Sequence, residues 1–513
     1  MEIRRKIVSA STPLINPGTT DYYHYRLLEI LPGVLSLGTL LACVFLSFTA
    51  PLAAVYIIIL YDFYWLLRVG YLSVYTISSW RHYRQAIKVN WRSRLEREVP
   101  HWHQYRHLLF LPMYNEPYHV VAATFDRLCQ SDYDLKNITV ILTGEERAIG
   151  HFAPIAEQIK TAYGNAFGQF ITNLHPTGVI GELPGKGSNM RHAAHIAQQY
   201  VDSRGWNYDD VIVSAFDIDT WVHPQYFSCL THSYGTVPNP TRRSYQPLAL
   251  YHNNIWQSDP FTRVVAYSTT FWLLTDLARA ERLFTFSSHS MSWRALVDVG
   301  FWEPDVVSED SRIFLQCLLC YKGDYRVEPI YVPVSMSTVY VGKFWRSICN
   351  QYLQVRRWAW GVENFAYMAW QFSKGTGRAI PVTIKIRHLF NYLEGNFSWA
   401  TSALIISILG WLPFKLASES IKHLAIVQNT PRILEGILSL ALIGLVVNAI
   451  LGTWMLPDEP PKRKPLVLAL MLAQYALVFI TMIAFGAMPA LDAQLRHILG
   501  GRFRLGFWVT EKK

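Results

Sequence analysis

Long apolar runs lie toward both ends of the chain. Two of them follow one another from Leu31 to about Tyr75 and are separated near Thr49-Ala50-Pro51. Three more cover residues 389–413, 433–456 and 466–489. A helix of about 20 apolar residues is long enough to cross the hydrocarbon core of a bilayer. The pattern therefore predicts two transmembrane helices near the N-terminus and three near the C-terminus.

Between these runs, short apolar segments alternate with helical stretches. Strands separated by helices predict a mostly parallel sheet with helices on both faces, which is an α/β fold. Ligands of such sheets bind at the carboxyl ends of the strands. The first strand is followed by Pro-Met-Tyr-Asn-Glu (112–116) and the fourth by Asp-Ile-Asp (217–219), so both ends would face one crevice. The candidate strands are His107–Leu111, Ile138–Leu142, Phe170–Asn173, Val211–Ala215 and Leu248–His252.

The pattern divides the chain into consecutive parts with different surroundings. The soluble α/β domain opens with a basic, amphipathic segment that we expect on the membrane surface, and an aromatic-rich stretch with interspersed charge is expected at the membrane interface. The parts are an N-terminal segment (1–30), two transmembrane helices (31–78), the α/β domain (79–346), interfacial helices (347–387), C-terminal transmembrane helices (388–489) and a C-terminal tail (490–513).

Composition and charge agree with a membrane protein. Hydrophobic residues make up 51% of the chain and charged residues only 16%, which is apolar for a soluble enzyme. The net charge of +10 does not indicate nucleic acid as a partner, because basic residues cluster beside the apolar runs. Basic flanks mark the cytoplasmic side of a membrane. We therefore expect a multi-pass protein of the plasma (inner) membrane, with the N-terminus and the α/β domain in the cytoplasm. These flanking residues are Arg4, Arg5, Lys6, Arg81, Arg84, Lys88, Arg92, Arg94 and Arg97.

Two carboxylates follow the strand-like run Val211–Phe216. Asp217 and Asp219 are separated by Ile218, and an extended backbone would point both carboxylates to one side. Two hard oxygen ligands at a strand end suit Mg²⁺ or Mn²⁺ held against a diphosphate. Asp-x-Asp is also a common strand-end or turn pattern, so other residues have to decide between the two interpretations.

Three further segments carry candidate chemistry. A glycine-rich turn (181–194) places Lys186 before a helical stretch, where it would contact a phosphate, although such turns also occur on ordinary surfaces. Glu309 and Asp310 lie at an expected helix start, either as acids that stabilise the helix dipole or as a catalytic base. Segment 354–361 puts Gln354, Arg357 and Trp358 on one helix, which is either a membrane-interface helix or part of the site.

Taken in order, these motifs resemble those of the membrane-embedded glycosyltransferases of family 2, which include cellulose, chitin and hyaluronan synthases. The resemblance covers residues 30 to 512. It rests on Tyr-Asn-Glu (114–116), the Lys186 turn, Asp217-x-Asp219, Glu309-Asp310 and Gln354-x-x-Arg357-Trp358.

The resemblance implies a Rossmann-like GT-A domain that uses a nucleotide-diphosphate sugar, commonly a UDP-sugar. Asp217 and Asp219 would bind Mg²⁺ or Mn²⁺ and the diphosphate, and Asp310, next to Glu309, would deprotonate the acceptor hydroxyl, with inversion at the anomeric carbon. Gln354, Arg357 and Trp358 would hold the acceptor end and the pyrophosphate. The expected contacts of the nucleotide are Asn115, Glu116, Glu145, Lys186, Asp217 and Lys512.

Several positions depart from the family's pattern. Glu145 stands where the family usually has an acidic pair, so the preference for uracil is open. His289 lies in the expected acceptor region, where it would contact an acceptor sugar or act as a core histidine. The last residues, Phe507-Trp-Val-Thr-Glu-Lys512, look like the gating loop of cellulose synthases. A cytoplasmic gating loop requires an even number of C-terminal spans, whereas the pattern predicts three. Either one of them is interfacial or re-entrant, which we expect, or the tail lies outside and the match is accidental.

The predicted function is metal-dependent, inverting transfer of a sugar to a growing polysaccharide or another glycan acceptor. One alternative is the transfer of a single sugar to a lipid carrier. A second is a membrane scaffold or polysaccharide channel without catalytic activity. The donor sugar, the nucleotide base, the linkage and the oligomeric state are not determined by the residues.

Overall fold

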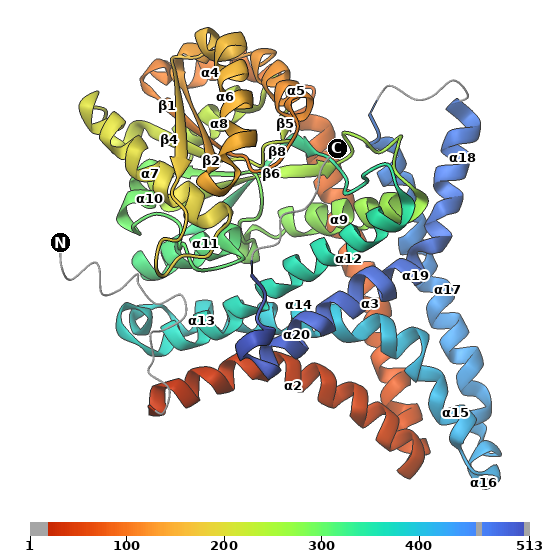
Figure 1. Cartoon of the computed structure of the whole chain (residues 1–513). Helices are drawn as coiled ribbons and strands as arrows, with labels where there is room; N and C mark the ends of the chain where they lie inside the picture. The colour runs from red at the N-terminus through yellow and green to blue at the C-terminus, as the bar shows by residue number, and fades with distance from the viewer. Residues whose placement is uncertain (1–18, 458–463, 507–513) are drawn as a thin grey trace.

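The computed structural model describes residues 19–457 and 464–506. A mixed sheet of eight strands forms the centre of its α/β domain, at the upper left of Figure 1, in the order β3-β2-β1-β4-β7-β6-β8-β5. Four of the seven neighbouring pairs are parallel, which confirms the predicted mostly parallel sheet. The strands are β1 Arg106–Pro112, β2 Ile138–Glu145, β3 Gln169–His175, β4 Val211–Ala215, β5 Trp221–Val222, β6 Arg243–Tyr251, β7 His289–Ser292 and β8 Arg326–Met336.

Helices cover both faces of this sheet. Leu109 and Leu111 of β1 belong to one apolar core and Leu108 and Phe110 to the other, because successive side chains of a strand point to opposite faces. A strand buried on both faces reads as a continuous apolar run, as the sequence of β1 does. The helices of the domain are α4 Trp91–Glu98, α5 Tyr118–Cys129, α6 Ile149–Tyr163, α7 Lys186–Ser203, α8 Tyr226–Thr236, α9 Pro260–Leu277, α10 Trp293–Asp298 and α11 Glu309–Cys320.

The strand order reverses beside β1. From β1 the chain continues to β2 and β3 on one side, and it then returns to β4 on the other side. β1 pairs in parallel with both β2 and β4, so the carboxyl ends of the three strands lie at one edge of the sheet. A crevice at such a reversal is the usual ligand site of an open α/β sheet.

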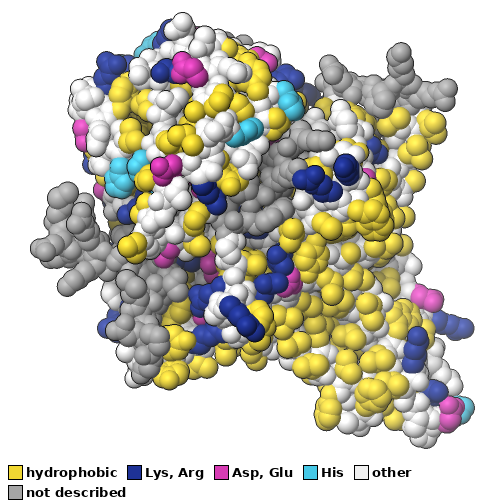
Figure 2. Space-filling model, viewed as in Figure 1, with side chains coloured by type: hydrophobic (Ala, Val, Ile, Leu, Met, Phe, Trp, Pro, Cys, Tyr) yellow, Lys and Arg dark blue, Asp and Glu magenta, His cyan; other side chains and the backbone are white. Residues whose placement is uncertain are grey.

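Long apolar helices precede and follow the α/β domain, as expected. Within residues 19–457 and 464–506, four helices are long and apolar enough to cross a membrane, or five if a pair bent by 43° counts as one span, by length and composition. In Figure 2, hydrophobic side chains gather over the lower right half of the molecule, which these helices form. The four are α2 Thr20–Thr49, α3 Pro51–Ala86, α17 Ala425–Trp454 and the segment Ala469–Leu499, and the bent pair is Val382–Ser407 with Leu409–Leu416.

The helix boundaries add two details to the predicted organisation. The first helix begins at Thr20, where Thr19 caps it, so part of the predicted N-terminal segment is helical. The aromatic-rich stretch forms two helices, which are joined by a 3₁₀ turn at Trp360–Val362. The remaining C-terminal helices are α12 Phe344–Ala359, α13 Glu363–Ser373, α14 Val382–Ser407, α15 Leu412–Leu416, α16 Glu419–Lys422, α18 Lys464–Gln474, α19 Val478–Met482 and α20 Met488–Leu499.

Candidate active site

A buried lysine joins three of the predicted site residues. The Nζ atom of Lys186 lies 3.0 Å from Asp217 Oδ1, 2.9 Å from Asp310 Oδ1 and 3.8 Å from Glu309 Oε1. Burial alone would lower the pKa of Lys186, but the carboxylates of Asp217, Asp310 and Glu309 outweigh it and raise this pKa above its usual range. Lys186 is therefore a cation inside a cluster of acids, at the carboxyl edge of β4.

Close packing of two helix starts creates this cluster. Lys186 is the first residue of α7, and Glu309 is the first residue of α11. A Cβ atom at Gly187 would lie 2.9 Å from the carbonyl oxygen of Glu303 and 3.2 Å from Glu309 Cβ. Only glycine lets the two helices approach this closely, which explains why a glycine follows Lys186.

The Asp217–Asp219 pair lies on a turn instead of an extended strand. The amide of Thr220 donates to the carbonyl oxygen of Asp217 over 2.9 Å, and Ile218 is buried as expected. Asp217 Oδ2 accepts a hydrogen bond of 2.6 Å from Ser287, while the buried Asp219 accepts one of 3.0 Å from the amide of Ser337. The two carboxylates therefore have different protein partners.

The donor set is suited to a metal ion that is shared with a substrate. Among the residues that the structure describes, no three His, Cys, Asp or Glu side chains are grouped as metal ligands. Mg²⁺ is commonly bound by one or two carboxylates together with the phosphates of the substrate. Asp217 and Asp219 would fit this arrangement, with diphosphate oxygens and water as the other ligands.

Glu309 and Asp310 occupy the predicted helix start but differ in environment. Glu309 is 2% exposed, and burial, followed by the nearby Asp310 carboxylate, raises the pKa of Glu309 to about 8 against the opposing effects of Lys186 and Arg357. Asp310 is partly exposed, and its backbone carbonyl accepts a hydrogen bond of 2.5 Å from Thr285 Oγ1. Asp310 is thus the accessible carboxylate of the two.

The predicted residues of α12 approach the Lys186 cluster beside Tyr251. The sequence motifs did not identify Tyr251 as a site residue. The Trp358 ring lies 5.8 Å from the Tyr251 ring at the end of β6. Burial raises the pKa of Tyr251, and the charges of Asp217, Asp219 and Asp310 raise it further while Arg357 lowers it. Tyr251 therefore lies between the acidic cluster and α12. The third predicted residue of this helix, Gln354, is buried.

The expected nucleotide contacts follow the neighbouring strands β1 and β2. Glu116 accepts a hydrogen bond of 2.7 Å from the amide of Tyr114, and Asn115 between them is exposed. Arg147 donates to Glu145 over 2.7 Å and lies 4.5 Å from the centre of the Tyr114 ring. Glu145 and Arg147 line a cavity of about 40 Å³ together with His175, Pro176, Thr177, Gly178, Val179, Glu182 and Pro184.

Two of the predicted site residues, His289 and Lys512, are not placed in the site by the contacts described above. The His289 ring is fully buried, with Nδ1 3.1 Å from the Phe286 carbonyl oxygen and 3.9 Å from Asp310 Oδ1. Burial lowers the pKa of His289 to about 4, so the ring is neutral, and contact with an acceptor stays a prediction. Lys512 and the rest of the Phe-Trp-Val-Thr-Glu-Lys segment lie outside the described residues.

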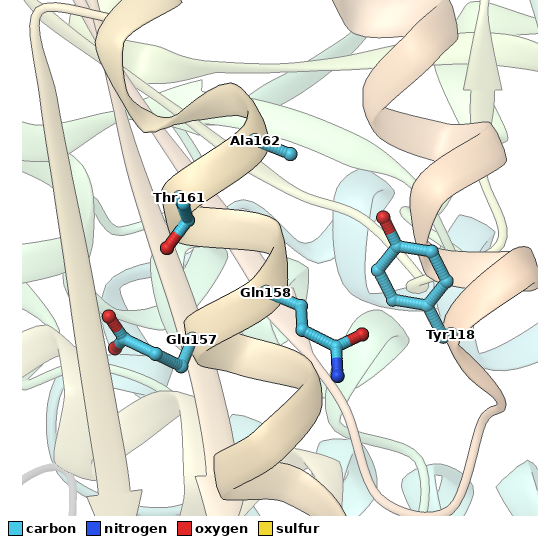
Figure 3. A pocket seen from close by; sticks show the side chains of 5 residues that line it. All are labelled: Tyr118, Glu157, Gln158, Thr161 and Ala162. Atoms are coloured by element: carbon cyan, nitrogen blue, oxygen red, sulfur yellow. The ribbon is translucent and has the colours of Figure 1, made fainter.

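A second hollow lies away from this chemistry. Tyr118, at the start of α5, and Glu157, Gln158, Thr161 and Ala162 of α6 line a space of about 340 Å³, and Figure 3 shows Gln158 and Ala162 on the side of α6 that faces Tyr118. None of these side chains belongs to the Lys186 cluster. We assign no role in the reaction to this hollow.

The sheet places the strand-end carboxylates and the buried lysine together at one edge, and a comparison with known protein families identifies the chain. A family model described as "Glycosyl transferase family group 2" matches residues 212–485, which is more than half of the 513 residues. The chain therefore belongs to this family and is a glycosyltransferase. None of the curated proteins compared with it matches its sequence.

Several solved structures are similar to this chain. One is the mannosyltransferase PcManGT from Pyrobaculum calidifontis in complex with GDP-Man and Mn²⁺, with a TM-score of 0.37, 13% identity and coverage of 80% of this chain and 99% of that one. Another is S. aureus TarS 1-349 in complex with UDP-GlcNAc, with a TM-score of 0.34, 12% identity and coverage of 68% and 91%. Because both scores are below 0.5, we draw no conclusion from them.

Proposed function

We propose that this glycosyltransferase is an integral-membrane, inverting enzyme that transfers a sugar from a nucleotide-diphosphate sugar to a glycan acceptor. The observation that carries the proposal is the Lys186 cluster, in which one buried cation contacts both Asp217 and Asp310. A leaving diphosphate requires positive charge, and an acceptor hydroxyl requires a base within reach. The cluster contains both groups at a strand edge that typically binds ligands.

In the proposed reaction, Asp310 accepts the proton of the acceptor hydroxyl while that oxygen attacks the anomeric carbon. The bond from this carbon to the diphosphate breaks, and the configuration inverts. Lys186 and Arg357 stabilise the negative charge that develops on the diphosphate. Mg²⁺ or Mn²⁺, held by Asp217 and Asp219, would supply further positive charge when bound.

The ion pair between Lys186 and Asp310 gives the reaction an order. While it persists, the carboxylate of Asp310 is held by Lys186 and is not available to the acceptor hydroxyl. A bound diphosphate competes for Lys186 and frees the carboxylate of Asp310. Donor binding therefore precedes deprotonation of the acceptor.

Membrane insertion is part of the proposal and is supported by the long apolar helices, and a cytoplasmic site is proposed from the basic residues beside them. The glutamine, arginine and tryptophan of α12 favour repeated addition, because the resembling family associates this motif with polymerising members. Transfer of one sugar to a lipid carrier is the other acceptor chemistry. The length of the product separates the two.

The direct test uses the purified full chain with a panel of UDP- and GDP-sugars, Mg²⁺ or Mn²⁺, and mass analysis of the product. We expect metal-dependent turnover of one donor and a product that carries several added sugars. A single addition would indicate the lipid-carrier reaction. Absence of both turnover and metal-dependent nucleotide binding would overturn the proposal in favour of a non-catalytic scaffold.

A further inference from the structure

A buried polar network lies behind the first turn of α11, the helix that begins with Glu309 and Asp310. Arg312 is 1% exposed, and its guanidinium donates to Glu303 Oε2 over 2.8 Å and to Asn364 Oδ1 over 2.6 Å. The side chain of Asn364 is fully buried. Buried polar groups are costly unless they are hydrogen-bonded, so this network fixes the geometry of its members.

Asn364 and Glu363 form hydrogen bonds with residues on both sides of the Glu309–Asp310 pair at the start of α11. Asn364 Nδ2 donates to Ser311 Oγ over 2.8 Å and to Ser308 Oγ over 3.2 Å. Glu363 Oε1 accepts a hydrogen bond of 2.6 Å from Ser308 Oγ. The residues that flank the Glu309–Asp310 pair are therefore held by the first two residues of α13.

Glu363 and Asn364 are also connected to α12, the second helix that carries predicted site residues, through a short turn. Only the turn Trp360–Val362 separates α13 from α12, which carries Arg357. The indole of Trp360 donates to Glu363 Oε2 over 3.2 Å. Contacts of Glu363 thus reach α11 and the end of α12 at once, and they couple the two helices.

An ion pair as deeply buried as Arg312–Glu303 adds little net stability, and apolar residues of similar volume often replace such pairs without loss. The pair instead fixes the side chains of Arg312 and Glu303 in a single geometry. Arg312 also lies over the Tyr367 ring at 3.8 Å, which fixes the plane of the guanidinium. The network thus suits a role in which small displacements matter, such as holding a base near a reacting hydroxyl.

We propose that Arg312 and Asn364 are positioning residues that set Asp310 on α11 relative to Arg357 on α12. Neither touches the substrate, and both act through the first turn of α11. The inference rests on the proposed function of Asp310 as the base. It adds a determinant of kcat that lies outside the motifs of the resembling family.

Asn364→Leu tests the proposal, because leucine keeps the volume and removes every hydrogen bond of the side chain. We expect kcat to fall by about 10- to 100-fold, while KM for the donor and the Kd of the nucleoside diphosphate change by less than about 3-fold. Ser311→Ala, which removes one partner of Asn364 and leaves Arg312 paired, keeps the test valid if the leucine variant does not fold. It should lower kcat by about 3- to 10-fold.

Asn137→Leu is the matched control, since Asn137 is also buried and accepts from an arginine, Arg106, before β2. It should lower the Tm as Asn364→Leu does but leave kcat within about 3-fold of the wild type. In an Asp310→Asn background, Asn364→Leu should cost no further rate, because it acts through Asp310.

Two results would overturn the proposal: unchanged kcat in both Asn364→Leu and Ser311→Ala, or an equal loss of kcat with and without the Asp310 carboxylate. Lack of sugar transfer by the wild type would instead refute the proposed function itself.

Discussion

Asp310 has to take a proton, and in the resting site its carboxylate is paired with Lys186. Asp310→Asn keeps the shape and hydrogen-bonding capacity of the side chain but removes the base. We expect the transfer rate to fall by about 10²- to 10⁴-fold, because general-base catalysis contributes this much. Nucleotide binding, measured by calorimetry with Mn²⁺, should be retained. A variant that keeps the wild-type rate would refute the assignment of the base.

Gly187 is the second residue-scale test. Gly187→Ala places a Cβ 2.9 Å from the Glu303 carbonyl oxygen and forces α7 and α11 apart. Overpacking of this kind costs about 1 to 3 kcal/mol, and the displacement should separate Lys186 from Asp310. We expect a lower Tm and a loss of donor affinity, measured by thermal unfolding and nucleotide titration.

Gly150 provides the control for this substitution, because it is likewise the second residue of a helix and an added Cβ would meet nothing within 4 Å. Gly150→Ala should leave the activity unchanged and raise the free energy of unfolding by about 0.4 to 1 kcal/mol. If both alanine variants behaved alike, close packing at Gly187 would not explain the glycine.

The sequence predicted the site residues that stand directly at strand ends and helix starts. The strand run before Asp217 and the glycine turn before Lys186 are local patterns, so both elements could be read before their neighbours were known. Tyr251 could not be found in this way. It enters the site because β6 ends beside α12, and this pairing depends on contacts between segments about one hundred residues apart in the chain.

At the scale of elements, the first turn of α11 predicts a dependence of stability on pH. Burial raises the pKa of Glu309 to about 8 from an ordinary value of 4.5. The folded protein then binds more protons than the unfolded chain between these values, so the free energy of unfolding decreases as pH rises through this range. Glu309→Gln removes this contribution, and its Tm should decrease less steeply than the wild-type Tm between about pH 5 and 8.

Glu157→Gln is the control for this measurement, because Glu157 is exposed on α6. Its Tm should follow the wild-type profile across the same pH range. A Glu309→Gln profile parallel to that of the wild type would show that Glu309 is not held in its protonated form.

The elements that the sequence missed share a physical reason. β7 has four residues, three of which are polar, and β8 contains Pro329 and Pro333, which lack a backbone donor. Such segments form strands only because the sheet supplies partners. All three antiparallel pairs involve β5 or β7, so the local pattern predicted the parallel part of the sheet and not its mixed edge.

At the scale of the whole molecule, α20 returns to the first turns of α2 and to the turn between α12 and α13 instead of ending at the far side. The His497 ring of α20 stacks on Trp360 at 3.8 Å, and the carbonyl of Ile498 accepts from Arg26 over 2.5 Å. Arg504 donates to both carboxylate oxygens of Glu29 at 2.7 and 2.8 Å. These contacts favour a last segment that is re-entrant, so that it enters and leaves the membrane on the same side. Three C-terminal apolar runs would then be compatible with a tail on the side of the active site.

Cysteine labelling from each side of oriented vesicles tests this topology. In a background with the exposed Cys129 and Cys349 replaced by serine, Arg502→Cys reports the tail, and Ser420→Cys reports the exposed α16. In Figure 1, α16 lies at the end of the molecule farthest from the sheet. We expect Arg502→Cys to be labelled from the same side as Cys129 in the wild type, and Ser420→Cys from the opposite side.

The contacts of Arg26 with Ile498 and of Glu29 with Arg504 place the end of α20 and the start of the tail beside the first turns of α2. If Arg502→Cys were labelled together with Ser420→Cys, the last segment would cross the membrane, and the tail would be separated from the Lys186 cluster by the bilayer. A role of the C-terminal Phe-Trp-Val-Thr-Glu-Lys segment over the bound nucleotide would then be impossible. Labelling together with Cys129 keeps the tail on the side where Lys186 and Asp310 meet the donor.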